Sequence, residues 1–394
     1  MKNYCLTLIK TGLPVLLAVL AANFARGQQE LTISHDITVL GGMKPIPVSL
    51  DGFSGEVTDV LKFDLYVQGF SFVASDAAQY QISGTAAGSV QGRVVDRFAK
   101  STILSRSYTG ASLRRQAHIF ADDIVQAITG KKGIGQTQIA FKAQSSTGNG
   151  EIYVADFDGH NAQSITHDDT IVAAPAWVPG RLAVYYTSYK RNNPDIFYHN
   201  LGTGQRRVIA GYSGLNTSAA VSPDGSKVAM ILSKSGSPNV WVGNADGTDL
   251  KRLTTSSEDS SPCWSPDGQW ICFATKIAER RVLAKVPAGG GTMQQIPTPG
   301  APNPTEPDWS PDGKWIVFTS QTSEFDICVV PASGGAPTVL VVGEDPSWSP
   351  NSRTLIFTRR AGGRYGLSVL DVFTKQVKDI ARISGSDSQP AWAR

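Results

Sequence analysis

The sequence is poor in charged residues, in cysteine and in long apolar runs. Charged side chains make up 18% of its 394 residues. Three of its 36 basic residues, Lys2, Lys10 and Arg26, lie in the first 27 positions, and the remaining 33 equal the 33 acidic residues. This balance excludes a nonspecific attraction to nucleic acid. No segment after the N-terminus has the ~20 apolar residues of a spanning helix, so we expect no membrane span in the mature chain.

The N-terminus itself has the pattern of a secretory signal peptide. Lys2 and Lys10 give a basic start, residues 13–22 an apolar core, and Ala25-Arg26-Gly27 a small-x-small cleavage site. The apolar core is too short for a permanent anchor. We therefore predict a signal peptide over residues 1–27, cleaved near Gly27, and an exported protein. The alternative is that these residues form a buried strand or helix.

Cysteine is scarce in the exported part. Cys5 would leave with the signal peptide, which keeps Cys263, Cys272 and Cys328, an odd number that does not make a disulfide framework. Cys263 and Cys272 bracket one predicted hairpin and could form a disulfide across it, or serve as small buried hydrophobic residues. No His lies at ligand spacing, so we predict no zinc site.

From about residue 170 onward the sequence contains a repeat. Its anchors are spaced 44, 43, 45, 39 and 44 residues apart. They are Trp177, Val221-Ser-Pro-Asp-Gly225, Trp264-Ser-Pro-Asp-Gly268, Trp309-Ser-Pro-Asp-Gly313, Trp348-Ser-Pro-Asn351 and Trp392. A period of about 40 to 45 residues with several short β runs is typical of four-stranded propeller blades. Ser-Pro-Asp-Gly suits a type I turn, because Pro presets φ at the second position.

Counting the repeats predicts six blades. Five complete repeats start at the first five anchors, and residues 138–166 supply three strands of a sixth blade. Residues 390–394 supply its missing first strand. Joining the two ends removes open strand edges, which otherwise favour aggregation. We therefore predict a mainly β fold, with a six-bladed β-propeller over residues 138–394 closed by the C-terminal strand 390–394.

Residues 28–133 do not follow this repeat and predict a small α/β domain ahead of the propeller. Residues 55–66 suit a helix and residues 70–73 a strand, while 90–95 and 101–107 suggest a hairpin. Ser112 is placed to cap a helix that ends at Gly130, with apolar residues at helical spacing. These apolar residues are Leu113, Ala117, Phe120, Ile124 and Ile128.

This arrangement resembles the TolB family of the Tol-Pal system, whose propellers are built from TolB-like (PD40) repeats. The resemblance rests on the helix 113–131 running into Gln138-Ile-Ala-Phe141, on Thr305-Glu-Pro-Asp-Trp309, and on the final Pro390-Ala-Trp392. The departures are a shortened first domain, Asn351-Ser352 in place of Asp-Gly, and an end just after Trp392.

The resemblance implies a monomeric periplasmic protein with no enzymatic activity. Its expected role is to bridge the inner-membrane Tol complex and the outer-membrane lipoprotein Pal. This role would support outer-membrane integrity and invagination during cell division, and protein import or translocation. The alternative is a secreted TolB-like propeller that binds a small ligand or acts as a hydrolase through its channel.

The segments just before each anchor connect one blade to the next, so they should gather at one end of the channel, here called the mouth. They carry eight acidic residues and no Lys or Arg. The candidate partner-binding residues there are His167, Asp168, Asp169, Asn216, Thr217, Glu258, Asp259, Asn303, Thr305, Glu306, Glu344, Asp345 and Asp387. This composition could be ordinary turn chemistry. It could also create a negative potential that receives a basic partner surface or a Ca²⁺ ion. The resemblance implies that a Pal-like lipoprotein docks here.

The predicted new N-terminus is a second candidate site. Its residues are Gln28, Gln29, Glu30, Leu31, Thr32 and Ile33. This polar lead into alternating apolar positions could add as a strand to a partner sheet. The resemblance implies that the partner is a TolA-like inner-membrane protein. Alternatively, these residues simply begin the sheet of the first domain.

Catalysis has little support in the sequence. The five His residues, His35, His118, His160, His167 and His199, belong to no motif with a nucleophile, and no Gly-x-Ser-x-Gly sequence occurs. Peptidases of the prolyl oligopeptidase type carry a similar propeller but need a further hydrolase domain, for which no sequence remains. We therefore expect no catalytic residues, and we expect each His to lie in a turn or at the surface.

Overall fold

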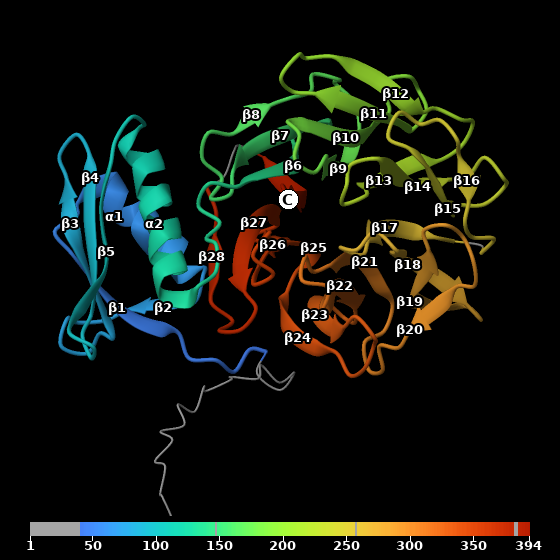
Figure 1. The fold of residues 1–394 in the computed structure, drawn as a ribbon. Coiled ribbons are helices and arrows are strands. Elements are labelled where there is room, and N and C mark those ends of the chain that lie inside the picture. Colours follow the sequence, from blue (N-terminus) through green and yellow to red (C-terminus); the bar gives the residue numbers. More distant parts are fainter. Residues whose placement is uncertain (1–39, 146–147, 257, 382–384) are drawn as a thin grey trace, which may run out of the picture. The chain divides into compact units, whose positions relative to one another are not determined.

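The computed structural model describes residues 40–145, 148–256, 258–381 and 385–394. The predicted signal peptide and the peptide 28–33 lie outside these residues. These described residues belong to one compact unit that holds both a small α/β domain and a ring of blades (Figure 1). Among the described residues, no helix is both long and apolar enough to cross a membrane.

The α/β domain is a five-stranded sheet covered on one face by two helices (Figure 1). The strand order is β2-β1-β3-β4-β5, in which β1 runs parallel to β2 and β3, and the remaining pairs are antiparallel. The elements are β1 (Ile46–Asp51), α1 (Gly55–Tyr66), β2 (Phe70–Phe72), β3 (Tyr80–Ala86), β4 (Val90–Asp96), β5 (Ser101–Tyr108) and α2 (Leu113–Thr129). Phe120 of α2 packs directly over Gly92 of β4, where an added Cβ would come within 2.1 Å of the ring.

Both helices and the hairpin lie where the sequence predicts them. The side chain of Ser112 accepts a hydrogen bond from the amide of Arg115 at 3.2 Å, and Gly130 ends α2 in the left-handed conformation with φ of 71°. Strands β1 and β3 are additional to the prediction. β1 contains Pro47 and β3 contains Gly84, and both residue types weaken a strand pattern in sequence.

The propeller has six four-stranded sheets, which confirms the predicted architecture. Blades 1 to 3 are β9 (Val172–Trp177) to β12 (Arg206–Ala210), β13 (Asn216–Val221) to β16 (Lys251–Arg252), and β17 (Ser260–Trp264) to β20 (Gln294–Ile296). Blades 4 and 5 are β21 (Pro304–Trp309) to β24 (Thr338–Val342), and β25 (Glu344–Trp348) to β28 (Val377–Asp379). Blade 6 has the order β29-β6-β7-β8, with β29 (Ser386–Trp392), β6 (Gln138–Gln144), β7 (Gly150–Asp156) and β8 (Gln163–Ser164).

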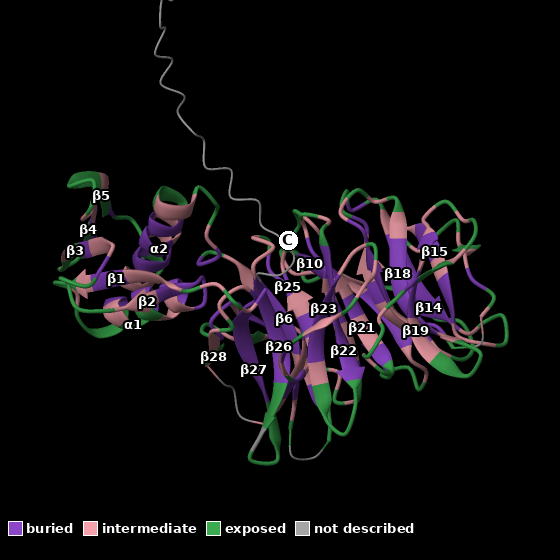
Figure 2. Ribbon diagram, turned by 90° about the horizontal axis from the view of Figure 1, so that it is seen from below, coloured by how far each residue is buried: buried purple, intermediate pink, exposed green. Residues whose placement is uncertain are grey.

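The middle strands of blades 1 to 5 complete these sheets. They are β10 (Ala183–Ser188), β11 (Asp195–Asn200), β14 (Lys227–Leu232), β15 (Asn239–Asn244), β18 (Trp270–Ile277), β19 (Arg280–Pro287), β22 (Trp315–Gln321), β23 (Phe325–Pro331), β26 (Thr354–Ala361) and β27 (Arg364–Asp371). Buried residues concentrate along the strands, and exposed residues gather at the hairpin tips (Figure 2).

Three of the repeated tryptophans link neighbouring blades. The indole N–H of Trp264 in blade 3 donates to the carbonyl of Ala220 in blade 2 at 2.9 Å. Trp348 in blade 5 donates to Asp308 O in blade 4, and Trp177 in blade 1 donates to Ala391 O in blade 6, both at 3.2 Å. Each of these bonds joins an innermost strand to the one before it. A buried indole needs such an acceptor, which explains why the residue recurs.

The α/β domain contacts blades 5 and 6. Phe63 and Val67, at the end of α1, pack in an apolar cluster with Phe157 and Trp392 of blade 6. The hydroxyl of Thr354 in blade 5 donates to the carbonyl of Val67 at 3.3 Å.

The three described cysteines are free and buried. Cys263 and Cys272 face each other across β17 and β18, so the predicted hairpin is present and holds two thiols. Burial and the neighbouring Cys272 raise the pKa of the Cys263 thiol. Both cysteines therefore serve as small buried residues in the cluster between blades 3 and 4.

Candidate functional site

The innermost strands place one unusual residue per blade around the channel. Every innermost strand has a β-bulge at the same point, where its register with the second strand shifts. One residue of each bulge has a left-handed backbone, with φ between 50° and 53°. This conformation is uncommon for residues other than Gly. We call these residues the bulge ring: Ala174, Ser218, Ser261, Glu306, Asp345 and Gln389.

Four of the six bulge-ring residues are joined by hydrogen bonds between blades. Glu306 Oε2 accepts from the amide of Asp345 at 3.0 Å, and Asp345 Oδ2 accepts from the amide of Gln389 at 3.3 Å. Gln389 Oε1 then accepts from the amide of Ala174 at 3.0 Å. The bulge directs each amide toward the preceding blade. The long polar side chains of blades 4, 5 and 6 therefore hold the ring together.

One consequence can be tested at Gln389. Replacing it with Ala removes the acceptor for the Ala174 amide, so we expect the free energy of unfolding to fall by about 1 kcal/mol. Urea unfolding measures this change. Ser261→Ala, at the equivalent ring position of blade 3, is the matched control and should change stability less. Equal effects in both variants would contradict a specific role of the Gln389 side chain.

The bulge ring lines a channel cavity of 470 Å³, and Arg394 also lines it. The Arg394 guanidinium pairs with Asp308 and donates to the carbonyls of Trp309 and Trp348, both at 3.3 Å. The C-terminus accordingly lies among the innermost strands (Figure 1). Asp308 is thus neutralised, whereas Glu306 and Asp345 form no ion pair with any described residue.

The two unpaired carboxylates lie beside a third, Glu344. Burial, with repulsion from Glu306 and Glu344, raises the pKa of Asp345. Burial and the charge of Glu306 likewise raise the pKa of Glu344. Carboxylates crowded in this way attract a cation, because a partner of opposite charge would relieve both the repulsion and the cost of burial. We call Glu306, Glu344 and Asp345 the channel carboxylates.

The structure brings the predicted mouth segments together at one end, but their side chains separate into three groups. Glu306 and Asp345 belong to the bulge ring, and Thr305, Glu344 and Thr217 lie next to it. His167, Asp169, Glu258 and Asn303 are exposed. Asp168, Asn216, Asp259 and Asp387 are mostly enclosed by protein.

The enclosed residues order the loops of the propeller. Asn216 accepts from the amide of Tyr212 at 3.0 Å and donates to its carbonyl at 2.7 Å. Asp259 accepts from the hydroxyls of Thr254 and Ser256. For Asn216 and Asp259, turn chemistry is therefore the better explanation than direct contact with a partner.

The mouth segments carry no Lys or Arg of their own, but basic side chains from elsewhere in the blades pair with two of their acids. Asp168 pairs with Lys190 at 3.1 Å and with Arg206 at 3.0 Å. Glu258 pairs with Lys276 at 2.8 Å and with Arg281 at 3.6 Å. These cations come from other strands and hairpins of the blades, which the segments before each anchor do not include.

The same hairpins add a set of basic residues that the sequence analysis missed. The antiparallel registers place the hairpins between the second and third strands at the mouth end, because Ser188 pairs with Asp195 and Lys276 with Arg281. They also carry Glu279 and Glu324. We call the basic residues the basic rim: Lys190, Arg191, Lys234, Lys276, Arg280, Arg281, Arg359, Arg360 and Arg364. The mouth therefore combines acidic groups at the channel with mainly basic groups outside them.

Two His residues differ from the sequence prediction of turn or surface positions. His118 and His199 are buried, and burial lowers the pKa of His199 to about 4. Within the described part of the chain, no three His, Cys, Asp or Glu side chains are grouped so as to hold a metal ion. A Ca²⁺ ion at the mouth stays an alternative prediction.

Comparisons with known proteins agree with this architecture. The TolB beta propeller domain family (PD40) matches residues 125–394. The chain is 33% identical over 188 residues to the Tol-Pal system protein TolB of Desulfosudis oleivorans, covering 45% of this chain and 42% of that protein. It is 36% identical over 163 residues to the protein TolB homolog of Chlorobaculum tepidum, covering 41% and 37%. The matching regions thus span less than half the length of these relatives.

Similarity in structure extends further along the chain. The crystal structure of TolB from Acinetobacter baumannii superposes with a TM-score of 0.82 and 22% sequence identity. The superposition covers 91% of this chain and 98% of that one. At this identity the match concerns the fold, and it includes the α/β domain as well as the blades.

Proposed function

Because the chain belongs to the TolB beta propeller family, we propose that it is a periplasmic, partner-binding component of a Tol-Pal system. The observation that carries the proposal is the mouth. Unpaired channel carboxylates lie at the end of a closed propeller, inside a basic rim. Such a site suits a partner that inserts a basic group into the channel and surrounds it with acidic residues.

We propose that the partner at the mouth is a Pal-like outer-membrane lipoprotein. The peptide 28–33 would engage a TolA-like inner-membrane protein, so that the chain bridges the two membranes. This bridging would support outer-membrane integrity and invagination at division, and protein translocation. The two candidate sites lie in different parts of the sequence, because the peptide precedes the α/β domain and the mouth belongs to the blades.

Catalysis through the channel has less support. The cavity volume of 470 Å³ falls within the range of small-molecule sites. No His is among the described residues that line it, so Ser218 and Ser261 have no neighbouring imidazole base there. Burial keeps the thiol of Cys263 protonated, because it raises the pKa. We therefore propose binding and not hydrolysis.

Binding kinetics with a purified Pal-like domain test the mouth. We expect Glu306→Gln with Asp345→Asn to raise Kd roughly tenfold, mostly through faster dissociation, because these groups are enclosed. Charge reversal on the basic rim, such as Arg281→Glu with Arg364→Glu, should instead slow association, and this effect should shrink at high salt. Asp312→Asn, in a turn at the opposite end, is the matched control.

Two further measurements distinguish the binding site of one partner from that of the other and test whether an ion takes part. Removing residues 28–33 should abolish capture of the TolA-like domain and leave binding of the Pal-like domain unchanged. A chelator should leave the rates unchanged if the channel carboxylates act directly, whereas a weaker complex in chelator would favour the Ca²⁺ ion. Association and dissociation rates that change neither with the mouth substitutions nor with salt would overturn the assignment of this site.

A further inference from the structure

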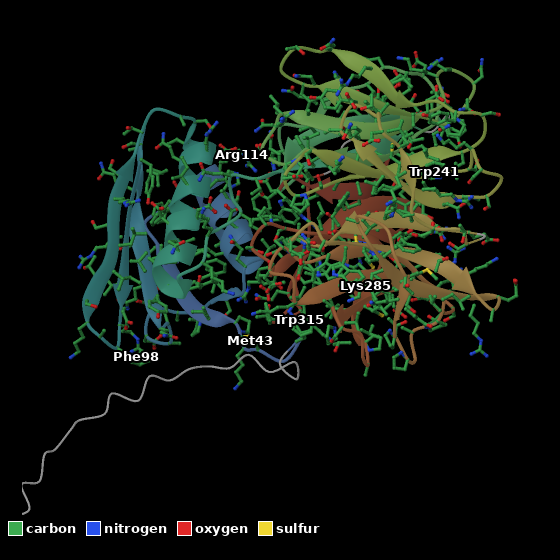
Figure 3. The ribbon with its side chains drawn as sticks, turned by 45° about the vertical axis from the view of Figure 1, so that its right-hand side comes forward. Met43, Phe98, Arg114, Trp241, Lys285 and Trp315 are labelled. Atoms are coloured by element: carbon green, nitrogen blue, oxygen red, sulfur yellow. The ribbon has the colours of Figure 1, made fainter. Side chains whose placement is uncertain are left out.

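A buried charge cluster joins the α/β domain to the propeller and includes none of the mouth residues. His118 of α2 contacts Asp64 of α1 through Nδ1 at 2.7 Å. On its other side, His118 Nε2 lies 3.6 Å from Asp158, in the turn between β7 and β8 of blade 6. Arg114 of α2 also pairs with Asp158. Arg114 lies on the side of α2 that faces the propeller (Figure 3).

Water is largely excluded from this cluster. The side chains of Asp64, His118 and Asp158 are 0%, 5% and 4% exposed. The ring of Phe157 lies 5.9 Å from the imidazole and 5.7 Å from the ring of Phe63. One oxygen of Asp64 and the Nε2 atom of His118 have no hydrogen-bond partner among the described residues. Buried polar atoms without partners are rare because they raise the free energy of the folded state, so the cluster is costly to bury.

The other charged groups around the cluster are few, and two of them, Glu56 and His160, contact its members directly. Asp122 of α2 accepts from the amide of Gly135 at 2.7 Å, and Glu56 of α1 pairs with Arg114 at 3.3 Å. On the propeller side, the exposed His160 lies 3.3 Å from Asp158. Blade 5 contributes the amide of Ala381, which donates to the carbonyl of Asp158, and Lys378 and Asp379 line the neighbouring groove.

The charges of Asp64, His118, Asp158 and Arg114 sum to zero only when the His118–Asp64 pair holds one extra proton. With His118 charged, the cations His118 and Arg114 match the anions Asp64 and Asp158. Burial raises the pKa of Asp64 to about 7. Burial opposes the charge of His118, but its hydrogen bond to Asp64 and the charges of Asp64 and Asp158 outweigh this and raise its pKa. The charge of Asp158 acts in the same direction on both groups, since it favours the protonated state of each.

We propose that this cluster is a proton-controlled latch, in which the protonated His118–Asp64 pair holds Asp158 and thereby keeps the α/β domain docked on the propeller. Undocking removes Asp158 from the pair, so docking is linked to proton uptake. The docked state is therefore favoured at and below about pH 7, and it weakens as pH rises through the values of the docked pair. The latch does not depend on which partner binds the mouth.

The test follows the distance between the two domains in the full exported chain. Cysteines placed at Phe98 and Leu182, which are 71% and 55% exposed, accept a pair of fluorescent labels, while the native cysteines are buried. Phe98 belongs to the α/β domain and Leu182 to blade 1. We expect the undocked population, measured by energy transfer, to rise roughly tenfold between pH 6 and pH 9, the change that a difference of about one pKa unit between the docked and undocked pair produces.

Three substitutions locate the response. Asp158→Asn should make the undocked population independent of pH, and it leaves the helices of the α/β domain intact. His118→Gln should change the response without abolishing it, because burial still raises the pKa of Asp64. His160→Gln, beside the same carboxylate but exposed, should keep the full response. The latch is overturned if the distance does not change with pH, if Asp158→Asn keeps the response, or if His160→Gln loses it.

Discussion

Deleting residues 390–394 should lower the free energy of unfolding by more than about 3 kcal/mol, the largest effect we expect from any change considered. These residues hold the end of β29, which pairs with β6 and closes blade 6. Trp392 is 3% exposed, and its indole N–H donates to the Thr137 hydroxyl at 2.8 Å. Its ring stacks on Phe157 at 6.0 Å. The deletion removes these contacts and exposes the edge of β6.

Denaturant unfolding of two single-residue variants shows how much Trp392 and Arg394 each contribute to this loss of stability. Trp392→Ala alone should cost about 3 kcal/mol or more, because it leaves a cavity beside Phe157. Arg394→Ala keeps β29 paired and loses only the guanidinium contacts with Asp308, Trp309 and Trp348, so its effect should be smaller. An unchanged melting temperature in the deletion variant would refute closure by the C-terminal strand.

Asp345→Asn should stabilise the protein by about 2 kcal/mol at pH 8, although it alters the proposed binding site. Burial raises the pKa of this carboxyl, so its protonated form favours folding. That contribution is complete below the pKa of the unfolded state and is lost as pH rises through the folded value. An amide keeps the acceptor oxygen for Gln389 and Thr358 and carries no charge at any pH.

Unfolding in urea at pH 5 and pH 8 measures this effect. The gap between Asp345→Asn and the unchanged protein should be wide at pH 8 and narrow at pH 5. Asp308→Asn is the matched control, because Asp308 is paired with Arg394 and should not gain stability. If Asp345→Asn destabilises the protein at pH 8, the channel carboxylates are not under mutual repulsion. Stabilisation with loss of binding would identify a charge retained for function.

The blades could be predicted from sequence because the same physical need recurs in each repeat. Trp264 and Trp348 each fill one interblade space and donate one hydrogen bond, so their spacing reports the architecture directly. Helix α2 was predictable for a similar reason, since its cap and apolar spacing are local. The parallel pairing of β1 with β3 depends on residues some 30 positions apart, which no local pattern shows.

The chemistry of the mouth could not be predicted to the same extent. Asp168 pairs with Arg206, which belongs to β12, the outermost strand of blade 1. The left-handed backbone of Asp345 lies at a β-bulge, and no residue type at that position predicts the bulge. His118 was missed because a polar residue within a helix gives no sign of its partners, Asp64 and Asp158, which lie 54 positions before it and 40 after it. The charges that surround a site depend on which residues the fold brings together, so the sequence does not show them. The number of strands follows from the repeat, which the sequence does show.

The position of β6 bears on how the chain would respond to mechanical force. β6 follows the α/β domain directly and lies between β29 and β7, with a ladder of backbone hydrogen bonds on each side. A pull on the α/β domain along the axis of β6 loads both ladders in shear, so many bonds must break together. A pull at right angles would open one ladder bond by bond. The fold is therefore strongest along the direction of β6, and a load passed from a partner of the α/β domain to a partner of the propeller would cross it there.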